Sequence, residues 1–306
     1  MVVRVRGGYV SRMRWTRGYS SDDVDDRRDE GPSSGGFGGG GTPIALLFWL
    51  FSRFGLPGVL IGGAALYFMS SFAGGGGSQP QPGEKRAATP TTQAEGDAVA
   101  FVSFVLDDVQ NTWKQRFAAE GRTYQKARMT LFRGSIGSAC GMGQRAMGPF
   151  YCPGDQKVYL DLAFYNDLHG RFGAPGDLAQ AYVVAHEIGH HVQHLLGTDA
   201  RMQKLSRGRT QGEDGGSVRL ELQADCFAGI WANSTEQRKL LDAGDVEGAL
   251  KAAASIGDDR LQKEATGTVQ PEKWTHGSAE ERARWFKRGY ETGKIEACDT
   301  FAAGSL

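Results

Sequence analysis

Apolar side chains recur at helical spacing in two long stretches of the chain. Between Asp97 and about Ala119 they fall every four residues, which predicts an amphipathic helix. The positions that carry this pattern are Phe101, Val105, Val109, Trp113 and Phe117. A second helix is predicted from about Leu178 to Leu196, with Gly197 as its stop. Its apolar residues lie on two opposite flanks, so this helix should be buried in the middle of a domain.

Shorter patterns predict the other elements of an α+β domain. Ser217–Gly229 has the pattern of a third helix, and Ala127–Phe132 and Lys157–Leu162 have the pattern of strands. Two segments, Ser234–Gln237 and Ser278–Glu281, have the form of capping boxes, which start helices.

A long apolar run from Ile44 to Phe72 contains few polar residues and is long enough to cross a membrane as one helix. Seven arginines precede it, whereas only Lys85 and Arg86 follow closely. The positive-inside rule therefore places the N-terminus in the cytoplasm and the remainder of the chain outside. Gly58 and Gly62 could pair two such helices into a homo-oligomer, although a single match of this kind is more often incidental.

This segment divides the chain into regions of different composition. Residues 1–43 are charged and then glycine-rich, which predicts a disordered cytoplasmic tail, and residues 73–96 have the composition of a flexible linker. Residues 97–306 are long enough to bury the core of one domain. Lysine plus arginine and aspartate plus glutamate both number 35, without a basic stripe, so nothing indicates a nucleic-acid partner.

The predicted central helix carries the H-E-x-x-H sequence His186-Glu187-Ile188-Gly189-His190. Two histidines four apart project from one face of a helix, so both imidazoles can reach one Zn²⁺ ion at roughly 2.0–2.1 Å. Glu187 would lie beside that ion and could take a proton from a zinc-activated water, as in metalloproteases. Gly189 costs roughly 1 kcal/mol relative to alanine, which indicates close packing by another segment.

A zinc ion held by two histidines needs a third protein ligand. His194 is excluded because it lies two turns from His186, roughly 12 Å along the helix axis. The three-histidine pattern H-E-x-x-H-x-x-G-x-x-H is also absent, since Gln193 and Leu196 occupy its Gly and His positions. The third ligand must therefore come from another element.

The predicted third helix places Glu221 and Asp225 four residues apart on one face. Glu221 can complete a His/His/Glu metal site. Asp225 can accept the free ring N–H of a ligand histidine and fix its tautomer. Small residues at Ala224, Ala228 and Gly229 would let the two helices approach closely.

These residues resemble the gluzincin metallopeptidases, whose third ligand is the Glu of an E-x-x-x-D sequence after H-E-x-x-H. HEIGHHVQ, LELQADCFAG, GPFYCPGDQKVYLDLAFY and THGSAEER together resemble the bacterial neutral zinc metallopeptidases of the YpfJ type, over most of the chain. Met13-Arg14-Trp15 matches the opening of that family, which makes Met13 a candidate start. The resemblance implies a zincin-like domain, mostly helical with a small sheet, behind one N-terminal transmembrane helix.

The segment Thr275–Arg282 is similar to the T-H-P-x-x-x-x-R sequence of membrane heat-shock and CaaX-prenyl proteases, with Gly277 in place of the proline. This likeness implies that His276 donates a hydrogen bond to the oxyanion and that Arg282 supports it. A capping or core role is the alternative for His276. By analogy with zincins, the strand Lys157–Leu162 would be the edge strand that pairs with an extended substrate.

The four cysteines, two in each half of the predicted domain, suit an oxidising compartment. Four cysteines allow three pairings. We predict Cys140–Cys152 and Cys226–Cys298, with buried free thiols as the alternative.

The sequence thus predicts a zinc metalloendopeptidase anchored in a bacterial inner membrane, with its catalytic domain outside the cytoplasm and a peptide or protein substrate. Zinc would polarise the scissile carbonyl, and Glu187 would pass a proton from water to the leaving amine. One alternative is a membrane-tethered zinc-binding scaffold, against which Glu187 argues because a scaffold needs no general base. Another is a zinc hydrolase of cell-wall peptides, which the same residues would serve.

Overall fold

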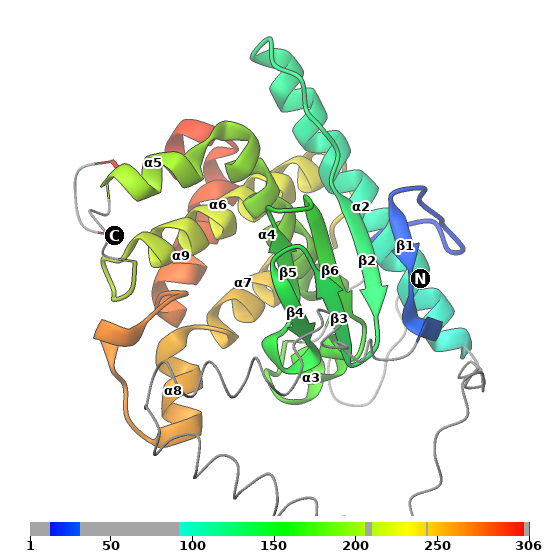
Figure 1. Cartoon of the computed structure of the whole chain (residues 1–306). Coiled ribbons are helices and arrows are strands. Elements are labelled where there is room, and N and C mark those ends of the chain that lie inside the picture. Colours follow the sequence, from blue (N-terminus) through cyan, green and yellow to red (C-terminus); the bar gives the residue numbers. More distant parts are fainter. Residues whose placement is uncertain (1–12, 31–91, 175, 206–209, 243, 303–305) are drawn as a thin grey trace, which may run out of the picture. The chain divides into compact units, whose positions relative to one another are not determined.

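The computed structural model describes residues 13–30, 92–174, 176–205, 210–242, 244–302 and 306. Helices form most of this part of the chain, beside a small sheet, which confirms the predicted α+β class (Figure 1). The α-helices are α2 (Gln93–Ala119), α3 (Phe164–Gly170), α4 (Asp177–Leu196), α5 (Thr198–Leu205), α6 (Gly216–Gln237), α7 (Asp245–Ser255), α8 (Asp258–Thr266) and α9 (Ala279–Thr292). Short 3-10 segments are η1 (Arg28–Glu30), η2 (Arg145–Met147), η3 (Pro271–Lys273) and η4 (Ile295–Cys298).

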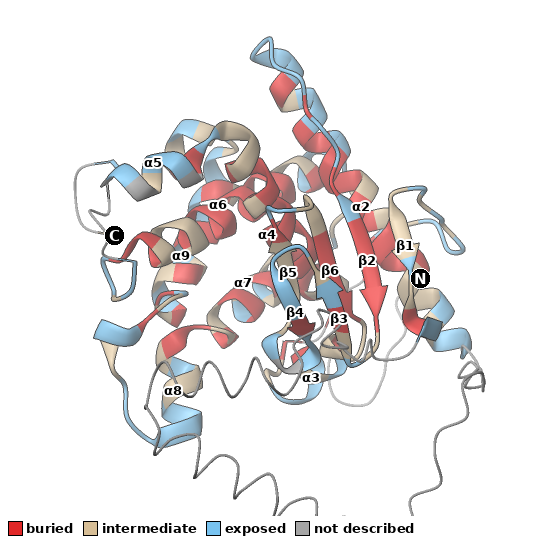
Figure 2. Cartoon of the chain, in the orientation of Figure 1, coloured by how far each residue is buried: buried red, intermediate tan, exposed pale blue. Residues whose placement is uncertain are grey.

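Four strands form the sheet in the order β1-β2-β6-β5, and β3 and β4 form a separate antiparallel hairpin. The strands are β1 (Val24–Asp26), β2 (Arg128–Phe132), β3 (Ser135–Ser138), β4 (Gly141–Gln144), β5 (Phe150–Cys152) and β6 (Lys157–Asp161). The first three strands of the sheet run parallel, and β5 runs antiparallel to β6. Figure 2 shows β2 and much of β6 buried, as expected for strands paired on both sides.

The prediction that Lys157–Leu162 forms the edge strand is wrong. The segment before it folds back as β5 and pairs with β6, with Phe150 opposite Tyr159 and Cys152 opposite Lys157. The rings of Phe150 and Tyr159 stack at 4.8 Å, which adds a cross-strand contact to the backbone bonds. The edge of the sheet on this side is therefore β5.

The N-terminal segment from Met13 to Glu30 is folded onto the domain, so the prediction of a disordered tail is wrong for these residues. Strand β1 pairs with β2, and Met13 is buried in the main core. Trp15 packs edge-on against Phe101 of α2, with ring centroids 5.3 Å apart. Composition did not predict this fold because a short segment needs few apolar side chains when its backbone also pairs with an existing sheet.

The predicted membrane segment, residues 44–72, lies outside the described residues, as do Gly58 and Gly62 and all of the predicted linker before residue 92. The end of that predicted linker belongs to α2, which starts at Gln93 because Thr92 caps it. In the part of the chain that the structure describes, no helix is both long and apolar enough to cross a membrane.

Helices α4 and α6 agree with the predicted helices, with one correction at the end of α6. Helix α4 starts one residue before the predicted Leu178 and stops at Gly197. Helix α6 runs past its predicted end, and Ser234–Gln237 is its last turn rather than the start of a new helix. The other capping box is confirmed, since Ser278 accepts from the backbone N–H of Glu281 at the start of α9.

Close packing of α4, α6 and α9 at glycines brings their polar residues together inside the domain. A Cβ added to Gly189 would lie 3.0 Å from the backbone of Ala224, which confirms the predicted close approach at Gly189. At Gly229 and Gly289, an added Cβ would overlap the backbone of the facing helix, α9 and α6 respectively. Both disulfides, Cys140–Cys152 and Cys226–Cys298, form as predicted, and the second ties α6 to η4.

Candidate metal centre

Helix α4 presents His186 and His190 on the same face, one turn apart. Their ring centroids are 4.8 Å apart and the rings are nearly perpendicular. His186 is 6% exposed, and the His190 side chain is partly open to a cavity. A buried helix therefore holds two imidazoles beside each other without either needing to move.

Hydrogen bonds fix which ring nitrogen of each histidine points into the site. His186 Nδ1 donates to Asp225 Oδ1 at 2.9 Å, because a carboxylate can only accept. His190 Nδ1 donates to Gln193 Oε1, also at 2.9 Å. The Nδ1 atom of each ring is therefore occupied by a hydrogen bond. The Nε2 atoms of His186 and His190 point toward the same position and remain available to a metal ion.

Glu221 of α6 stands at that point. Its Oε2 lies 3.2 Å from His186 Nε2, and its Oε1 lies 3.4 Å from His190 Nε2. Ligand atoms of the three residues all lie within 4.8 Å of one another. Two imidazoles and one carboxylate are the donor set of a zinc site with an open fourth position, so these residues fit zinc.

The imidazoles and carboxylates of this cluster shift one another's pKa values. Burial lowers the pKa of His186, but Asp225 and Glu221 together outweigh it and raise that pKa to about 10. Burial raises the pKa of Glu221, yet the two histidines hold it well below its usual range. Zinc would bind imidazole nitrogens that carry no proton, so its binding would be coupled to proton release.

Glu187 lies on the same helix between the two histidines and lines the same cavity. The residue is 7% exposed. Burial raises the pKa of Glu187 above its ordinary value, although the charges of His186 and His190 oppose that shift. A carboxylate in this environment takes up a proton more readily than an exposed glutamate does.

Asp225 is fully buried and is held by Arg282 of α9. Arg282 Nε donates to Asp225 Oδ2 at 3.0 Å, and Tyr182 donates its hydroxyl proton to Asp225 Oδ1. Burial raises the pKa of Asp225, but Arg282 and His186 hold it below its ordinary value. Sequence reasoning missed the Tyr182 hydroxyl, although Tyr182 lies one turn before His186 on α4.

His276 lines the cavity from the loop before α9, where Asp258 holds it in place. Asp258 Oδ2 accepts from the backbone N–H groups of Thr275 and His276 at 2.6 Å each, and Asp258 Oδ1 lies 3.1 Å from His276 Nδ1. The hydrogen bond that His276 donates to Asp258 raises the pKa of His276, against partial desolvation, which lowers it.

The resemblance implied that Arg282 supports His276, and the structure corrects this. The hydrogen bonds of Arg282 go to Asp225 and Tyr182, whereas the contacts of His276 run to Asp258 and Thr275. Asp258 escaped sequence reasoning because it precedes His276 by 18 residues and belongs to no motif.

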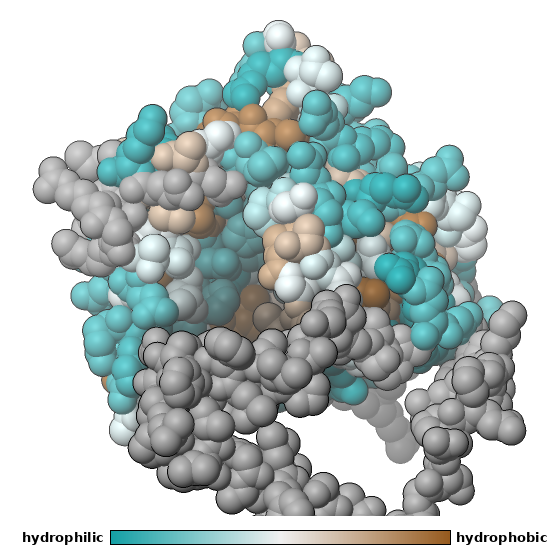
Figure 3. All heavy atoms as spheres, viewed as in Figure 1, coloured by the Kyte–Doolittle hydropathy of each residue, from teal (hydrophilic) through white to brown (hydrophobic). Residues whose placement is uncertain are grey.

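These residues open onto a cavity of about 1040 Å³ between β5, α3, α4 and α8. Figure 3 shows a hollow on this face of the molecule, with apolar atoms inside it. The apolar residues that line the cavity include Met147, Phe150, Phe164, Phe172, Ile256 and Leu261. A hydroxyl–imidazole bond of 3.0 Å from Tyr151 to His191 fixes β5 against α4 at the cavity wall.

Comparison with known proteins gives one family for nearly the whole chain. A family model described as "Putative neutral zinc metallopeptidase" matches residues 13–301. Uncharacterized protein YpfJ of Escherichia coli (strain K12) is 44% identical over 299 residues, which cover 94% of this chain and 99% of that protein. An uncharacterized protein of Mycobacterium tuberculosis is 46% identical over 194 residues, covering 60% of this chain and 65% of that protein. No solved structure matches the chain significantly.

The H-E-x-x-H and E-x-x-x-D residues, on which part of the family resemblance rests, lie together in the structure. His186, Glu187 and His190 come from α4, and Glu221 and Asp225 come from α6. On the extent of the family match and of the similarity to YpfJ, the chain belongs to the putative neutral zinc metallopeptidase family.

Proposed function

We propose that this protein is a zinc-dependent endopeptidase that hydrolyses peptide bonds in peptides or proteins. The observation that carries the proposal is the convergence of two imidazole Nε2 atoms and the Glu221 carboxylate beside Glu187. His186, His190 and Glu221 would hold the zinc ion. When bound there, zinc supplies a Lewis acid and a water whose pKa is lowered to about 7.

Glu187 is the proposed general base. It takes the proton of the attacking water and returns it to the leaving amine. Its raised pKa makes Glu187 a stronger base than an exposed glutamate, which favours the first half of that transfer.

His276 is the proposed donor to the developing oxyanion. Asp258 binds its Nδ1, so the opposite ring nitrogen is left to act on substrate in the cavity that both His276 and Glu187 line. Its raised pKa keeps that nitrogen protonated, and therefore a donor, to higher pH than in an ordinary histidine.

The position of the edge strand beside α4 supports binding of an extended substrate. Strand β5 is the edge of the sheet beside α4, and Phe150 and Tyr151 line the cavity. A peptide backbone could pair with this edge as an added strand. The apolar cavity wall would then accept an apolar substrate side chain.

Two alternatives use the same residues. A zinc-binding scaffold has no use for Glu187, and burying a carboxylate costs free energy, so its place in the cavity favours catalysis. A hydrolase of cell-wall peptides needs the same chemistry and differs only in substrate. The two disulfides favour a location outside the cytoplasm for either enzyme.

The test is cleavage of a broad peptide pool by the full-length protein before and after removal of metal. We expect cleavage at neutral pH, loss on chelation and recovery when zinc is returned. A matched variant, Glu221→Ala, should retain neither zinc nor activity. Cleavage that survives chelation would contradict the proposal.

A further inference from the structure

The partner of His190 is a buried amide rather than a carboxylate. Gln193 lies on α4, one turn after His190, and is 1% exposed. Its Oε1 accepts from His190 Nδ1 at 2.9 Å. His186, in contrast, is held by the charged Asp225. The two proposed zinc ligands are thus oriented by different chemistry.

The orientation of the Gln193 amide is fixed by its other bonds. Its Nε2 donates to the backbone carbonyl of Leu220 at 2.6 Å and to Gln223 Oε1 at 3.1 Å. Reversing the amide would place its oxygen against two acceptors, so Oε1 must face His190.

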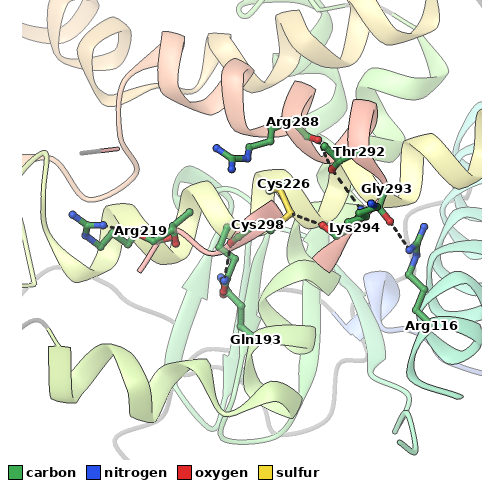
Figure 4. Close-up of a disulfide and its surroundings, with 11 residues drawn as sticks. Arg116, Gln193, Arg219, Cys226, Arg288, Thr292, Gly293, Lys294 and Cys298 are labelled. Atoms are coloured by element: carbon green, nitrogen blue, oxygen red, sulfur yellow. Dashed lines mark hydrogen bonds between the residues drawn. A yellow bond between two sulfur atoms is a disulfide. The ribbon is translucent and has the colours of Figure 1, made fainter. Parts of the chain in front are cut away.

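Gln223 is fixed in turn by the C-terminal segment. Its Nε2 donates to the carbonyl oxygen of Cys298 at 3.0 Å, and the residue is 6% exposed. Cys298 is bonded through its sulfur to Cys226, which lies one turn after Gln223 on α6. Figure 4 shows this disulfide with Gln193 nearby. The hydrogen bonds therefore run without a break from the metal cluster to a disulfide-linked carbonyl.

We infer that Gln193 positions His190 for zinc, and that Gln223 and the Cys226–Cys298 disulfide hold Gln193 in the orientation this requires. The inference rests on the proposed zinc site. With Oε1 of Gln193 fixed as an acceptor, His190 keeps its proton on Nδ1 and offers Nε2 to the metal. Partners of this kind affect metal affinity because they set the tautomer and direction of the ligand ring.

Zinc affinity of the full-length protein, measured by competition with a chromophoric chelator, tests the first step. Gln193→Leu should bind zinc about 10- to 100-fold more weakly, the usual cost of losing such a partner. Gln237→Leu is the matched control, because Gln237 is exposed on α6 and bonds only within that helix. Its affinity should equal that of the parent. Unchanged affinity in Gln193→Leu would overturn the inference.

Gln223→Leu tests the second step and keeps the test decisive if Gln193→Leu does not fold. It leaves the bonds of Gln193 to His190 and Leu220 in place, so its zinc affinity should fall between those of the parent and Gln193→Leu. Affinity equal to that of the parent would exclude Gln223 from the arrangement.

The disulfide is tested by comparing two double variants. Cys226→Ala/Cys298→Ala should weaken zinc binding, whereas Cys140→Ala/Cys152→Ala should leave it unchanged. The loss should be smaller than in Gln223→Leu, since Arg219 and Thr300 also bind the C-terminal segment to α6. In a variant that already carries Gln223→Leu, removal of the Cys226–Cys298 bond should weaken zinc binding no further. If the two losses of zinc affinity were fully additive, the disulfide would not act through Gln223.

These results are separate from those that test the proposed function. A parent protein that binds zinc but cleaves nothing would refute the peptidase proposal and leave the role of Gln193 standing. If instead the parent cleaves peptides and the Gln193→Leu variant has unchanged zinc affinity, the peptidase proposal stands and the role of Gln193 is refuted.

Discussion

His276 and Asp258 form a pair whose effect can be measured directly. Asp258 accepts from His276 Nδ1 and from its backbone N–H, and this hydrogen bonding raises the pKa of the imidazole. The pair stabilises the fold while His276 is protonated. That contribution is complete below the unfolded-state pKa of about 6.5 and is lost as pH rises through the raised folded-state pKa.

We predict that Asp258→Asn lowers the pKa of His276 toward or below its ordinary value. The amide removes the negative charge, while partial desolvation of the imidazole, which lowers that pKa, remains. An NMR titration of the imidazole signals measures the change. Asp259→Asn is the control, because Asp259 accepts from Ala279 N and does not hold His276. An equal shift in both variants would show that the charge acts at a distance rather than through the bond.

Arg282 and Asp225 are both buried, with side chains 2% and 0% exposed. Removing Arg282 leaves the buried Asp225 carboxylate without its guanidinium partner, held only by Tyr182 and His186. We expect Arg282→Met to lower the free energy of unfolding by about 3–5 kcal/mol, as measured by denaturant titration. Lys287→Met on the same helix breaks an exposed pair with Glu291 and should cost less than about 1 kcal/mol. Similar losses in the two variants would contradict this role of Arg282.

At the level of secondary structure, the contact of α6 with α9 depends on two glycines that face each other's helices. Gly289 meets the backbone of Cys226, and Gly229 meets the backbone of Phe286 and Tyr290. This close approach brings Arg282 to Asp225. The metal cluster is thus supported by a helix crossing in which side chains larger than hydrogen do not fit.

Gly289→Ala should therefore destabilise the protein by about 1–3 kcal/mol or more, because the added methyl group overlaps α6. Gly96→Ala in α2 is the control, since nothing lies within 4 Å of its added Cβ. Alanine there should stabilise the protein by roughly 0.5–1 kcal/mol. Thermal unfolding of both variants measures the difference, and a neutral Gly289→Ala would mean that α9 can shift without cost.

The sequence predicted α4, α6 and the residues that meet between them because periodicity and the H-E-x-x-H and E-x-x-x-D spacings are local. Asp258 was missed because its partner is brought near only by the folded loop before α9. The edge strand was assigned wrongly because β5, which folds back onto β6 directly after it in sequence, has only three residues and little pattern of its own. Ser234–Gln237 matches the capping-box sequence but lies within α6, which continues through these residues because the helix remains packed there.

For the whole molecule, the folded N-terminal segment has a consequence for membrane topology. Residues 13–30 and the domain share one sheet through β1 and β2, so they lie on the same side of any membrane. The predicted single span at residues 44–72 lies between them in sequence and would put them on opposite sides. One crossing there and the β1–β2 pairing cannot occur in the same molecule.

We predict that residues 13–30 and the domain are accessible from the same side. Single cysteines at Ser20 and Lys287, both exposed, can be labelled in intact cells with a thiol reagent that does not cross membranes. The four native cysteines are disulfide-bonded and should not react. Either both positions or neither should be labelled. Labelling of Lys287→Cys alone would restore the single-span topology and mean that β1 is not paired in the cell.

The central claim is that Glu187 performs proton transfer at a zinc site formed by His186, His190 and Glu221. Comparing peptide cleavage by the parent and by Glu187→Gln, both with zinc content measured, tests it most directly. Glutamine keeps the size of the side chain but cannot accept the proton, so we expect retained zinc and a loss of activity of about 100-fold or more. A zinc-loaded Glu187→Gln variant that cleaves as fast as the parent would contradict the account.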